Sequence, residues 1–302
     1  MIRSTIVGAF GVVFGLGTIL AQDVIMKALS AQYSVIQLLF IRSVFALVIL
    51  VCILPLISCT KPLRSNRRGL QILRGSLQFL SFACYYIALQ RMPILELVTV
   101  FFSAPLIAVA LSVPVLKERV GLMRWVALCI GFLGALLIIG PQRTGFNHGV
   151  TLLAFGAAAL YAGSIVVTRI LGEKDQSVTT ALYTLIMYVM LSGIAVSSME
   201  VIFSMSATQG ADYGSNYWIT PTLNHIGMLA IAGLAVCVAF LLLAHAYRQA
   251  PVSVLVPWEY SALIWGGLYG YIFWNELPTA LTVTGGVLIV VSGIYSSQNS
   301  TN

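Results

Sequence analysis

Charged residues are scarce in this 302-residue sequence, in which 8% of residues are charged and 59% are hydrophobic. Soluble domains carry roughly 25% charged residues, because a water-facing surface needs them. A soluble fold cannot bury this much apolar surface, so the composition excludes an ordinary water-soluble domain. It predicts a protein whose solvent is lipid.

Several chemical signatures are also missing. The five cysteines all lie in or beside apolar runs, which argues against a disulfide framework. No glycine-rich stretch ends in Lys-Ser or Lys-Thr, so a phosphate-binding loop and drive by ATP are not expected. We find neither metal-ligand spacing nor a paired nucleophile and base. The sequence therefore predicts no cofactor, no metal site and no enzyme.

What charge there is has a consistent distribution. The net charge is +7, and the basic residues fall in short segments between apolar runs. This placement indicates membrane orientation and gives no sign of a nucleic-acid partner. With the N-terminus inside, the inner segments hold 12 Lys and Arg residues and the outer segments 3, while Arg42 lies within a span. The bias predicts that both termini are cytoplasmic. Nothing in the sequence indicates an oligomeric state.

The apolar runs predict an all-α polytopic membrane protein with ten transmembrane helices. A bilayer core of about 30 Å needs about 20 apolar helical residues, and ten windows meet this criterion. The predicted spans are 5–26, 35–57, 69–90, 94–116, 122–140, 149–171, 179–200, 225–247, 252–273 and 279–297. The polar segment 204–224 is predicted to be an outward-facing loop, for whose greater length we have no physical account.

One pattern occurs twice in the chain. Ala88, Pro93, Ser103, Ala104 and Glu118 recur as Ala246, Pro251, Ser261, Ala262 and Glu276 at an offset of 158 residues. The repeat predicts two five-helix halves, 1–141 and 148–297. Because five is odd, the second half must cross the membrane in the opposite sense, which gives inverted repeats. Inverted halves are typical of transporters that work by alternating access, although a duplication without mechanistic consequence gives the same pattern.

Several short stretches resemble one family. They are Ile41-Arg42-Ser43, Leu73-Arg74-Gly75, Ser103-Ala104-Pro105, Lys117-Glu118-Arg119-Val120, Pro257-Trp258-Glu259-Tyr260 and Asn275-Glu276-Leu277-Pro278. With the ten-span topology, they make nearly the whole chain resemble the EamA-like branch of the drug/metabolite transporter superfamily. The Pro-x-Glu-Tyr pattern looks like a subgroup with riboflavin importers and S-adenosylmethionine carriers.

The resemblance implies a secondary transporter in the bacterial inner membrane that moves a small organic solute. It favours uptake of riboflavin or S-adenosylmethionine, with coupling to protons or to a counter-solute. The alternative is a proton-coupled exporter of amino-acid-like metabolites or drugs. A membrane-embedded enzyme needs catalytic groups near one interface, where the acids are sparse, and crowded aromatic residues argue against a passive channel.

Glu259 is the deepest predicted carboxylate. It lies about seven residues, or ~10 Å, into the ninth predicted span. Charged groups at this depth usually face a cavity or a partner. Pro257 bends the helix beside it, and Trp258 and Tyr260 flank it, so we expect a substrate or proton site there, with Pro257 and Pro105 as hinges. The alternative is a carboxylate that is only hydrogen-bonded to a neighbouring helix.

Two further groups of polar residues are candidates for the same site. Arg42 stays charged in lipid and needs a partner, for which Asp23, Glu96 and Glu259 are available. Such a pair can recognise a carboxylate-bearing solute or only connect two helices. Asp23 and Lys27 are four residues apart, which favours a local ion pair near the outer surface, either interfacial or part of an outer gate.

Aromatic and amide residues complete the expected site. Rings lining a cavity would stack on a flat solute, although Trp and Tyr also gather at interfaces and between helices. The polar-aromatic set is Gln22, Gln78, Tyr85, Tyr86, Phe101, Phe102, Tyr161, Ser164, His245, Trp258, Tyr260 and Trp265. Of these, Gln78, Tyr86 and Tyr161 join the candidate substrate residues. Glu118 and Glu276 are expected to be structural caps near helix N-termini or loop anchors, and not substrate ligands.

Overall fold

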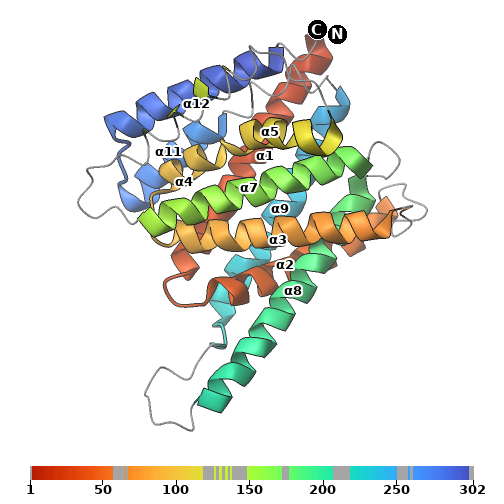
Figure 1. The fold of residues 1–302 in the computed structure, drawn as a ribbon. Coiled ribbons are helices and arrows are strands. Elements are labelled where there is room, and N and C mark those ends of the chain that lie inside the picture. Colours follow the sequence, from red (N-terminus) through yellow and green to blue (C-terminus); the bar gives the residue numbers. More distant parts are fainter. Residues whose placement is uncertain are drawn as a thin grey trace.

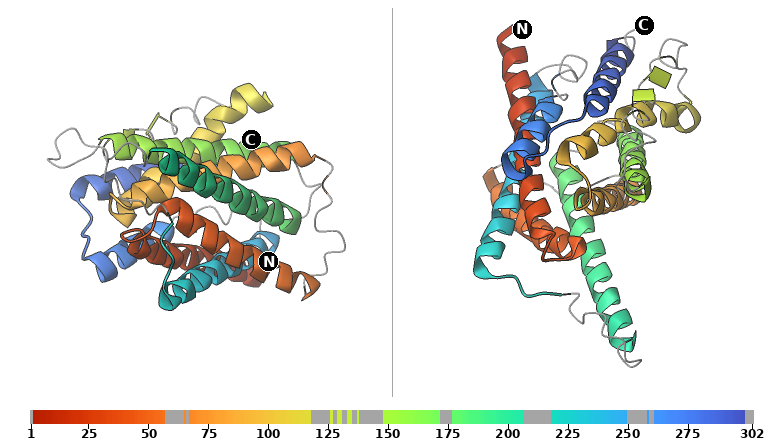
Figure 2. Two further views of the ribbon diagram at one scale, coloured as in Figure 1. Left: turned by 90° about the horizontal axis from the view of Figure 1, so that it is seen from below. Right: turned by 90° about the vertical axis from the view of Figure 1, so that its left-hand side faces the viewer.

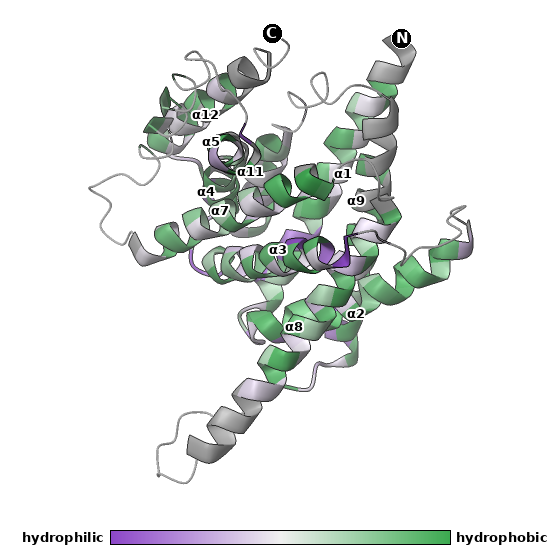
Figure 3. Cartoon of the chain, turned by 45° about the vertical axis from the view of Figure 1, so that its right-hand side comes forward, coloured by the Kyte–Doolittle hydropathy of each residue, from purple (hydrophilic) through white to green (hydrophobic). Residues whose placement is uncertain are grey.

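The computed structural model describes residues 2–56, 65, 67–117, 126, 129–130, 133–134, 137, 148–171, 177–206, 218–249, 258 and 261–298. These residues are helical apart from short connections, and no strand occurs among them. Six of the described helices are long and apolar enough to cross a membrane. Hydrophobic residues dominate the helix surfaces, and hydrophilic ones gather at one end of α3 (Figure 3). The chain is therefore an all-α, multi-pass membrane protein.

The helices follow the predicted spans closely. Their bounds are α1 (Ile2–Leu29), α2 (Val35–Ile53), α3 (Arg68–Leu89), α4 (Ile94–Phe101), α5 (Ala104–Leu116), α7 (His148–Leu171), α8 (Ser177–Ser206), α9 (Leu223–Gln249), α11 (Ser261–Trp274) and α12 (Ala280–Gln298). A short 3₁₀ helix, Leu54–Leu56, extends α2. Most of the predicted span 122–140 and the start of the predicted span 252–273 lie outside the described residues.

The fourth predicted span is present as the membrane-capable run Ile94–Val115, but its helix is interrupted by two residues. Helix α4 ends at Phe101 and α5 begins at Ala104, with Pro105 in its first turn. Proline lacks an amide hydrogen, so Pro105 cannot donate to the carbonyl of Phe101 four residues earlier. The chain consequently closes a tighter turn, in which the Ser103 amide donates to the Val100 carbonyl at 3.0 Å. The break lies beside the cavity described below.

Helix contacts follow a reciprocal pattern (Figure 1). Helix α1 packs on α9, and α3 packs on α7. Likewise α2 packs on α9 as α3 does on α8, while α11 lies against α1 as α5 does against α7. Each of these named contacts has a counterpart when the helices of one predicted half are exchanged for those of the other. This pairing is what two equivalent halves produce, and it brings α1, α3, α4, α7 and α11 together at the centre.

The ends of the chain lie together. Helix α1 begins and α12 ends at the same end of the molecule, whereas α8 projects away from it (Figure 2). An even number of crossings puts both termini on one side, and the end of α8 then faces the opposite side, as predicted for the segment that follows it. Which side of the membrane the termini face stays a prediction from the basic residues.

Candidate functional site

A cavity of about 160 Å³ lies between α1, α3, α4, α7 and α11. Its walls are Leu16, Ile19, Leu20, Asp23, Phe82, Tyr85, Val98, Phe101, Phe102, Ala104, Tyr161 and Ala262. Residues from both predicted halves contribute, since Tyr161 and Ala262 belong to the second half and the rest to the first. Asp23 is the one acidic or basic side chain in this set. The cavity is thus a mostly apolar, aromatic chamber with one carboxylate.

Four aromatic side chains form one wall of this chamber. The ring centroids of Phe101 lie 5.2 Å from Tyr85 and 5.0 Å from Tyr161. Phe82 lies 5.8 Å from Tyr85 and 6.0 Å from Phe101. These separations are those of favourable tilted and edge-to-face pairs. The rings come from α3, α4 and α7, so the wall joins three helices around the break after α4.

Asp23 is fixed by hydrogen bonds from neighbouring phenols. The hydroxyl of Tyr85 donates to Asp23 Oδ2 at 2.9 Å, and that of Tyr86 donates to Asp23 Oδ1 at 2.8 Å. The amide of Gln22 donates to the same Oδ1 at 2.6 Å. All four side chains are buried. Three donors stabilise the carboxylate charge in a place where water is scarce.

Arg42 reaches the same network without touching Asp23. Its Nη1 donates to Gln22 Oε1 at 2.6 Å and to the Tyr86 hydroxyl at 3.1 Å. The Tyr86 hydroxyl also accepts from the Gln22 amide, so this one oxygen donates once and accepts twice. The guanidinium lies over the rings of Tyr86 and Tyr188, at 5.5 and 5.9 Å from their centroids. Two opposite charges are thereby connected through neutral groups.

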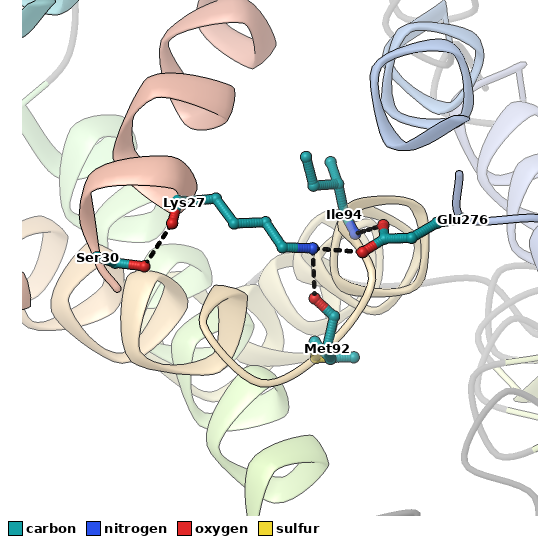
Figure 4. A network of polar contacts seen from close by, with 5 residues as sticks. All are labelled: Lys27, Ser30, Met92, Ile94 and Glu276. Atoms are coloured by element: carbon teal, nitrogen blue, oxygen red, sulfur yellow. Dashed lines mark hydrogen bonds and ion pairs between the residues drawn. The ribbon is translucent and has the colours of Figure 1, made fainter. Parts of the chain in front are cut away.

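The predicted pair of Asp23 and Lys27 is wrong. Lys27 Nζ lies 2.6 Å from Glu276 Oε1, between the end of α1 and the segment joining α11 to α12 (Figure 4). Lys27 also donates to the carbonyl of Met92 at 3.3 Å and lies over the ring of Trp274. Asp23 is already satisfied by Tyr85, Tyr86 and Gln22. The long side chain of Lys27 therefore pairs with Glu276, a carboxylate of the predicted second half.

Glu276 does cap a helix, but a different one from that expected. Its Oε2 accepts from the backbone amide of Ile94 at 3.1 Å, at the N-terminus of α4 (Figure 4). Helix N-termini leave such amides unpaired, and a carboxylate is favoured there. Asn275 makes this possible by taking a left-handed conformation with φ 54° at the end of α11. Gly270 leaves room for the carboxylate, since an added Cβ would lie 3.2 Å from Glu276 Oε2. Glu118, its counterpart in the repeat, lies outside the described residues.

The other predicted residues are those compared with the cavity wall, those elsewhere in the described helices, and those outside the described residues. Trp258 is half exposed and does not line the cavity, whereas Tyr161 does. Gln78 is buried with its Oε1 unpartnered, and its carbonyl accepts from Tyr188. Pro105 lies in the first turn of α5. The third group, Glu259, Tyr260 and Pro257, together with the side chain of His245, lies outside the residues or side chains that the structure describes.

Sequence reasoning missed some of the cavity wall. Phe82 and Ala262 were not named as candidates, and neither was the contact of Glu276 with α1. Phe82 precedes Tyr85 and Tyr86 by three and four residues, a spacing that puts all three on one helical face. That spacing is the signal that would have identified Phe82. Ala262 and Glu276 belong to the second half, and their positions depend on how the halves pack.

Comparison with known proteins identifies relatives that are transporters. Residues 3–140 match the EamA-like transporter family. The chain is 24% identical over 91% of its length to the S-adenosylmethionine uptake transporter of Rickettsia bellii, covering 88% of that protein. It is 25% identical over 74% of its length to the pseudopaline exporter CntI of Pseudomonas aeruginosa, covering 73%. The riboflavin transporter of Vibrio cholerae is 27% identical, with 68% of this chain and 63% of that one covered.

A solved crystal structure shares the fold. It is 18% identical in sequence, with a TM-score of 0.61, and the match covers 99% of this chain and 98% of the other. At this identity the match speaks for architecture alone.

Proposed function

We propose that the chain is a member of the drug/metabolite transporter superfamily and a secondary transporter of a small organic solute, which the match of residues 3–140 to the EamA-like transporter family supports. The observation that carries this proposal is the cavity lined by residues of both predicted halves, in which Asp23 is the one carboxylate among the described lining residues. Midplane sites at a repeat interface are typical of secondary transporters. No enzymatic step is proposed.

The solute site comprises the cavity and the hydrogen-bonded network behind it. Asp23, Tyr85 and Tyr161 face the solute, while Tyr86 holds Asp23 directly and Arg42 acts on it through Gln22 and Tyr86. Gln78 extends the polar face of α3 toward the cytoplasmic side. Glu259, with Trp258 and Tyr260, supplies the protonatable group of the second half, and Pro105 and Pro257 are the hinges.

Alternating access follows from two inverted halves, 1–141 and 148–297. The ion pair of Lys27 and Glu276 joins these halves on the predicted outer side. A contact of this kind closes the outer path while the cytoplasmic path is open. With both termini in the cytoplasm of a bacterial cell, the conformation described here is the outward-closed one.

Riboflavin and S-adenosylmethionine are the first solutes to test, with uptake as the proposed direction. The relative named as an S-adenosylmethionine uptake transporter supports uptake, and the riboflavin transporter supports the second solute. The pseudopaline exporter supports export, and the alternative is a proton-coupled exporter of amino-acid-like metabolites or drugs. An importer and an exporter can share this fold and site, so the direction of transport has to be measured.

The decisive experiment compares uptake of labelled riboflavin and labelled S-adenosylmethionine in bacterial cells that lack their own carriers. Saturable accumulation of either, lost in Asp23→Asn with unchanged expression, is the expected result. Accumulation of neither by the expressed wild-type protein would overturn uptake of these solutes. Faster loss of a preloaded solute from expressing cells would then favour export.

A further inference from the structure

Positive charge is concentrated at the predicted cytoplasmic end of α3. Residues 61–74 contain five basic residues and no acidic one, the basic ones being Lys61, Arg64, Arg67, Arg68 and Arg74. Arg67 and Arg68 are exposed, and Arg74 is partly exposed. Charge of one sign at this density raises the local concentration of anions. The contacts of Arg67 and Arg74 show that part of this charge is gathered at one place.

Arg74 is held by two threonine hydroxyls of the predicted second half. Its Nε donates to Thr168 Oγ1 of α7 at 2.7 Å, and its Nη1 donates to Thr184 Oγ1 of α8 at 2.8 Å. Each hydroxyl donates in turn to a carbonyl of its own helix, at 2.7 and 2.8 Å. The hydroxyls therefore accept from Arg74 with their lone pairs, and they orient the guanidinium group without neutralising it.

Arg67 brings a second guanidinium group to the same turn of α7. Its Nη1 donates to the carbonyl oxygen of Ile170 at 2.9 Å. Helix α7 ends at Leu171, so the contacts of Arg67 and Arg74 both fall in its last turn. Seven residues separate the two arginines, about 10 Å at the helical rise, whereas two residues, or about 3 Å, separate Thr168 and Ile170. The two side chains therefore converge.

The last turn of α7 offsets only part of this charge. A helix C-terminus carries about half a negative charge, and two guanidinium groups carry two positive ones. The sequence from 169 to 176 adds no net charge, because it holds two basic and two acidic residues: Arg169, Lys174, Glu173 and Asp175. Two like charges held at one helix end favour an anion beside them. Phosphate and carboxylate groups suit the planar fork of arginine, which presents paired donors.

The two arginines lie on the cytoplasmic side of the cavity. Thr168 is exposed and follows Tyr161, a residue of the cavity wall, by seven positions, so both lie on one face of α7. On α3, Arg74 precedes Phe82, also in the wall, by eight positions. Both spacings correspond to about 10–12 Å along a helix. The arginines are therefore well separated from Asp23 and from the aromatic side chains of the cavity.

We propose that Arg67 and Arg74 form a site for an oxyanion group, a phosphate or a carboxylate, at the cytoplasmic ends of α3 and α7. The oxyanion accepts hydrogen bonds from both guanidinium groups. The site is separate from the cavity, and it does not depend on which solute the cavity binds. A dissolved oxyanion and the phosphate of an acidic phospholipid of the inner leaflet share this chemistry.

The test measures stabilisation of the purified full-length protein by inorganic phosphate. The protein, in phosphatidylcholine nanodiscs, is titrated with sodium phosphate and, separately, with sodium chloride of equal ionic strength, and thermal unfolding gives the apparent affinity. Phosphate also stabilises proteins by exclusion from their surface, an effect that does not depend on one side chain. We expect an additional, saturable stabilisation. Arg67→Gln and Arg74→Gln should each weaken the apparent affinity about tenfold, as expected for one charge-assisted hydrogen bond.

The neighbouring arginine provides a matched control. Arg68 is also exposed, but it lies about 100° around the helix from Arg67, so Arg68→Gln removes one charge from the same end of α3 without removing a proposed ligand. Its apparent affinity should change by less than about twofold. Arg74→Lys keeps the charge without the fork and should weaken binding several-fold, and it replaces Arg74→Gln if that variant does not fold.

Nanodiscs that contain phosphatidylglycerol distinguish the two sources of the oxyanion. If a lipid phosphate fills the site, phosphatidylglycerol should stabilise the wild-type protein more than Arg67→Gln and should abolish the response to inorganic phosphate. If the ligand is a dissolved oxyanion, the response to phosphate should persist.

Two results would overturn the proposal. One is the lack of both a saturable response to phosphate and a response to phosphatidylglycerol that depends on Arg67 or Arg74. The other is an equal loss in Arg68→Gln, which would show a diffuse effect of charge. None of these measurements requires transport, so failure of the labelled solutes to accumulate would leave the oxyanion site in place.

Discussion

Arg42 and Asp23 are opposite charges that meet only through neutral groups. Gln22 and Tyr86 lie between them, and each donates a hydrogen bond to Asp23 and accepts one from Arg42. Such an arrangement balances charge within the membrane and still leaves the carboxylate facing the cavity. A direct ion pair would instead compete with any cationic solute for Asp23.

Removal of Arg42 should be costly for stability. Arg42→Ala leaves Asp23 buried without a nearby cation and two hydrogen bonds unmade, so the free energy of unfolding should fall by about 2–4 kcal/mol. Arg42→Lys should recover only part of this, because an ammonium lacks the planar fork. Unfolding in mixed micelles measures both variants. If Asp23→Asn combined with Arg42→Ala is as destabilised as the sum of the two single variants, the charges are not coupled.

Glu259 is the residue on which proton coupling is proposed to depend. Glu259→Gln keeps the size of the side chain and removes the titrating group, so accumulation driven by a pH gradient should vanish while exchange of solute across the membrane persists. Accumulation and exchange are measured in proteoliposomes, with folding checked by gel filtration. Wild-type accumulation by this variant would rule out Glu259 as the coupling group.

At the scale of single residues, the sequence predicted charges better than contacts. Asp23, Arg42 and Tyr86 were candidates because charged groups and phenols in lipid need a hydrogen-bonding partner, and the structure places all three in one network; their contact with a solute stays a prediction. Their connection through Gln22 was not predictable, since Gln22 and Arg42 lie on different helices and only packing brings them together. The pairing of Asp23 with Lys27 was mispredicted because helical spacing ignores a better partner supplied by another helix.

At the scale of elements, glycines decide where helices approach closely. An added Cβ on Gly233 of α9 would lie 2.9 Å from Phe45 Cβ and 3.0 Å from the Ala46 amide nitrogen of α2. By contrast, nothing lies within 4 Å of a Cβ added to Gly227 on the same helix. Small residues at helix contacts are typical of membrane proteins, because they let backbones come together.

This contrast gives a matched pair of substitutions on one helix. Gly233→Ala should destabilise the protein by about 1–3 kcal/mol, because the α2 backbone cannot yield as a flexible side chain would. Gly227→Ala should be neutral or stabilising by up to about 1 kcal/mol, because alanine is the better helix former. Thermal unfolding of the purified variants gives both values. Equal effects would mean that α2 and α9 are not in close contact.

The positions of the helices were largely predictable, whereas the two-residue interruption inside the span Ile94–Val115 was not. A continuous apolar run predicts a transmembrane helix, because in lipid each backbone amide and carbonyl must find its hydrogen-bond partner within the helix. The run 94–116 met this criterion, and Pro105 was identified as a hinge, yet the run was predicted as a single helix. Proline at this position ends a helix or only bends it, depending on whether neighbouring helices accommodate the loose turn, and that depends on tertiary packing.

At the scale of the whole molecule, the contact of Lys27 with Glu276 should control access to the cavity. Lys27→Met removes the ion pair and leaves Glu276 on α4, so the outward-open population should rise by about five- to thirtyfold, as for a contact worth 1–2 kcal/mol. The variant Ala262→Cys, made in a protein without its natural cysteines, reports access to the cavity wall. A membrane-impermeant maleimide applied outside should label it correspondingly faster.

A conservative change serves as the control. Lys27→Arg keeps the charge opposite Glu276, so its labelling rate should stay near that of the parent. Unchanged labelling in Lys27→Met, or faster labelling from the cytoplasmic side alone, would contradict an outer closing role for this pair.

Helix α4 joins that outer contact to the chamber. It is only eight residues long, or about 12 Å, with the Ile94 amide held by Glu276 at one end and the Phe101 ring in the cavity wall at the other. A helix this short should transmit a displacement at one end to the other, so a solute in the cavity and the contact with Glu276 should affect each other. Coupling between two sites is reciprocal. If a bound solute displaces Phe101, it should weaken the contact of Glu276 with α4 by the same free energy by which that contact weakens solute binding. Solute in the cavity would thus favour opening on the predicted outer side, and α4 would keep that side closed when the cavity is empty.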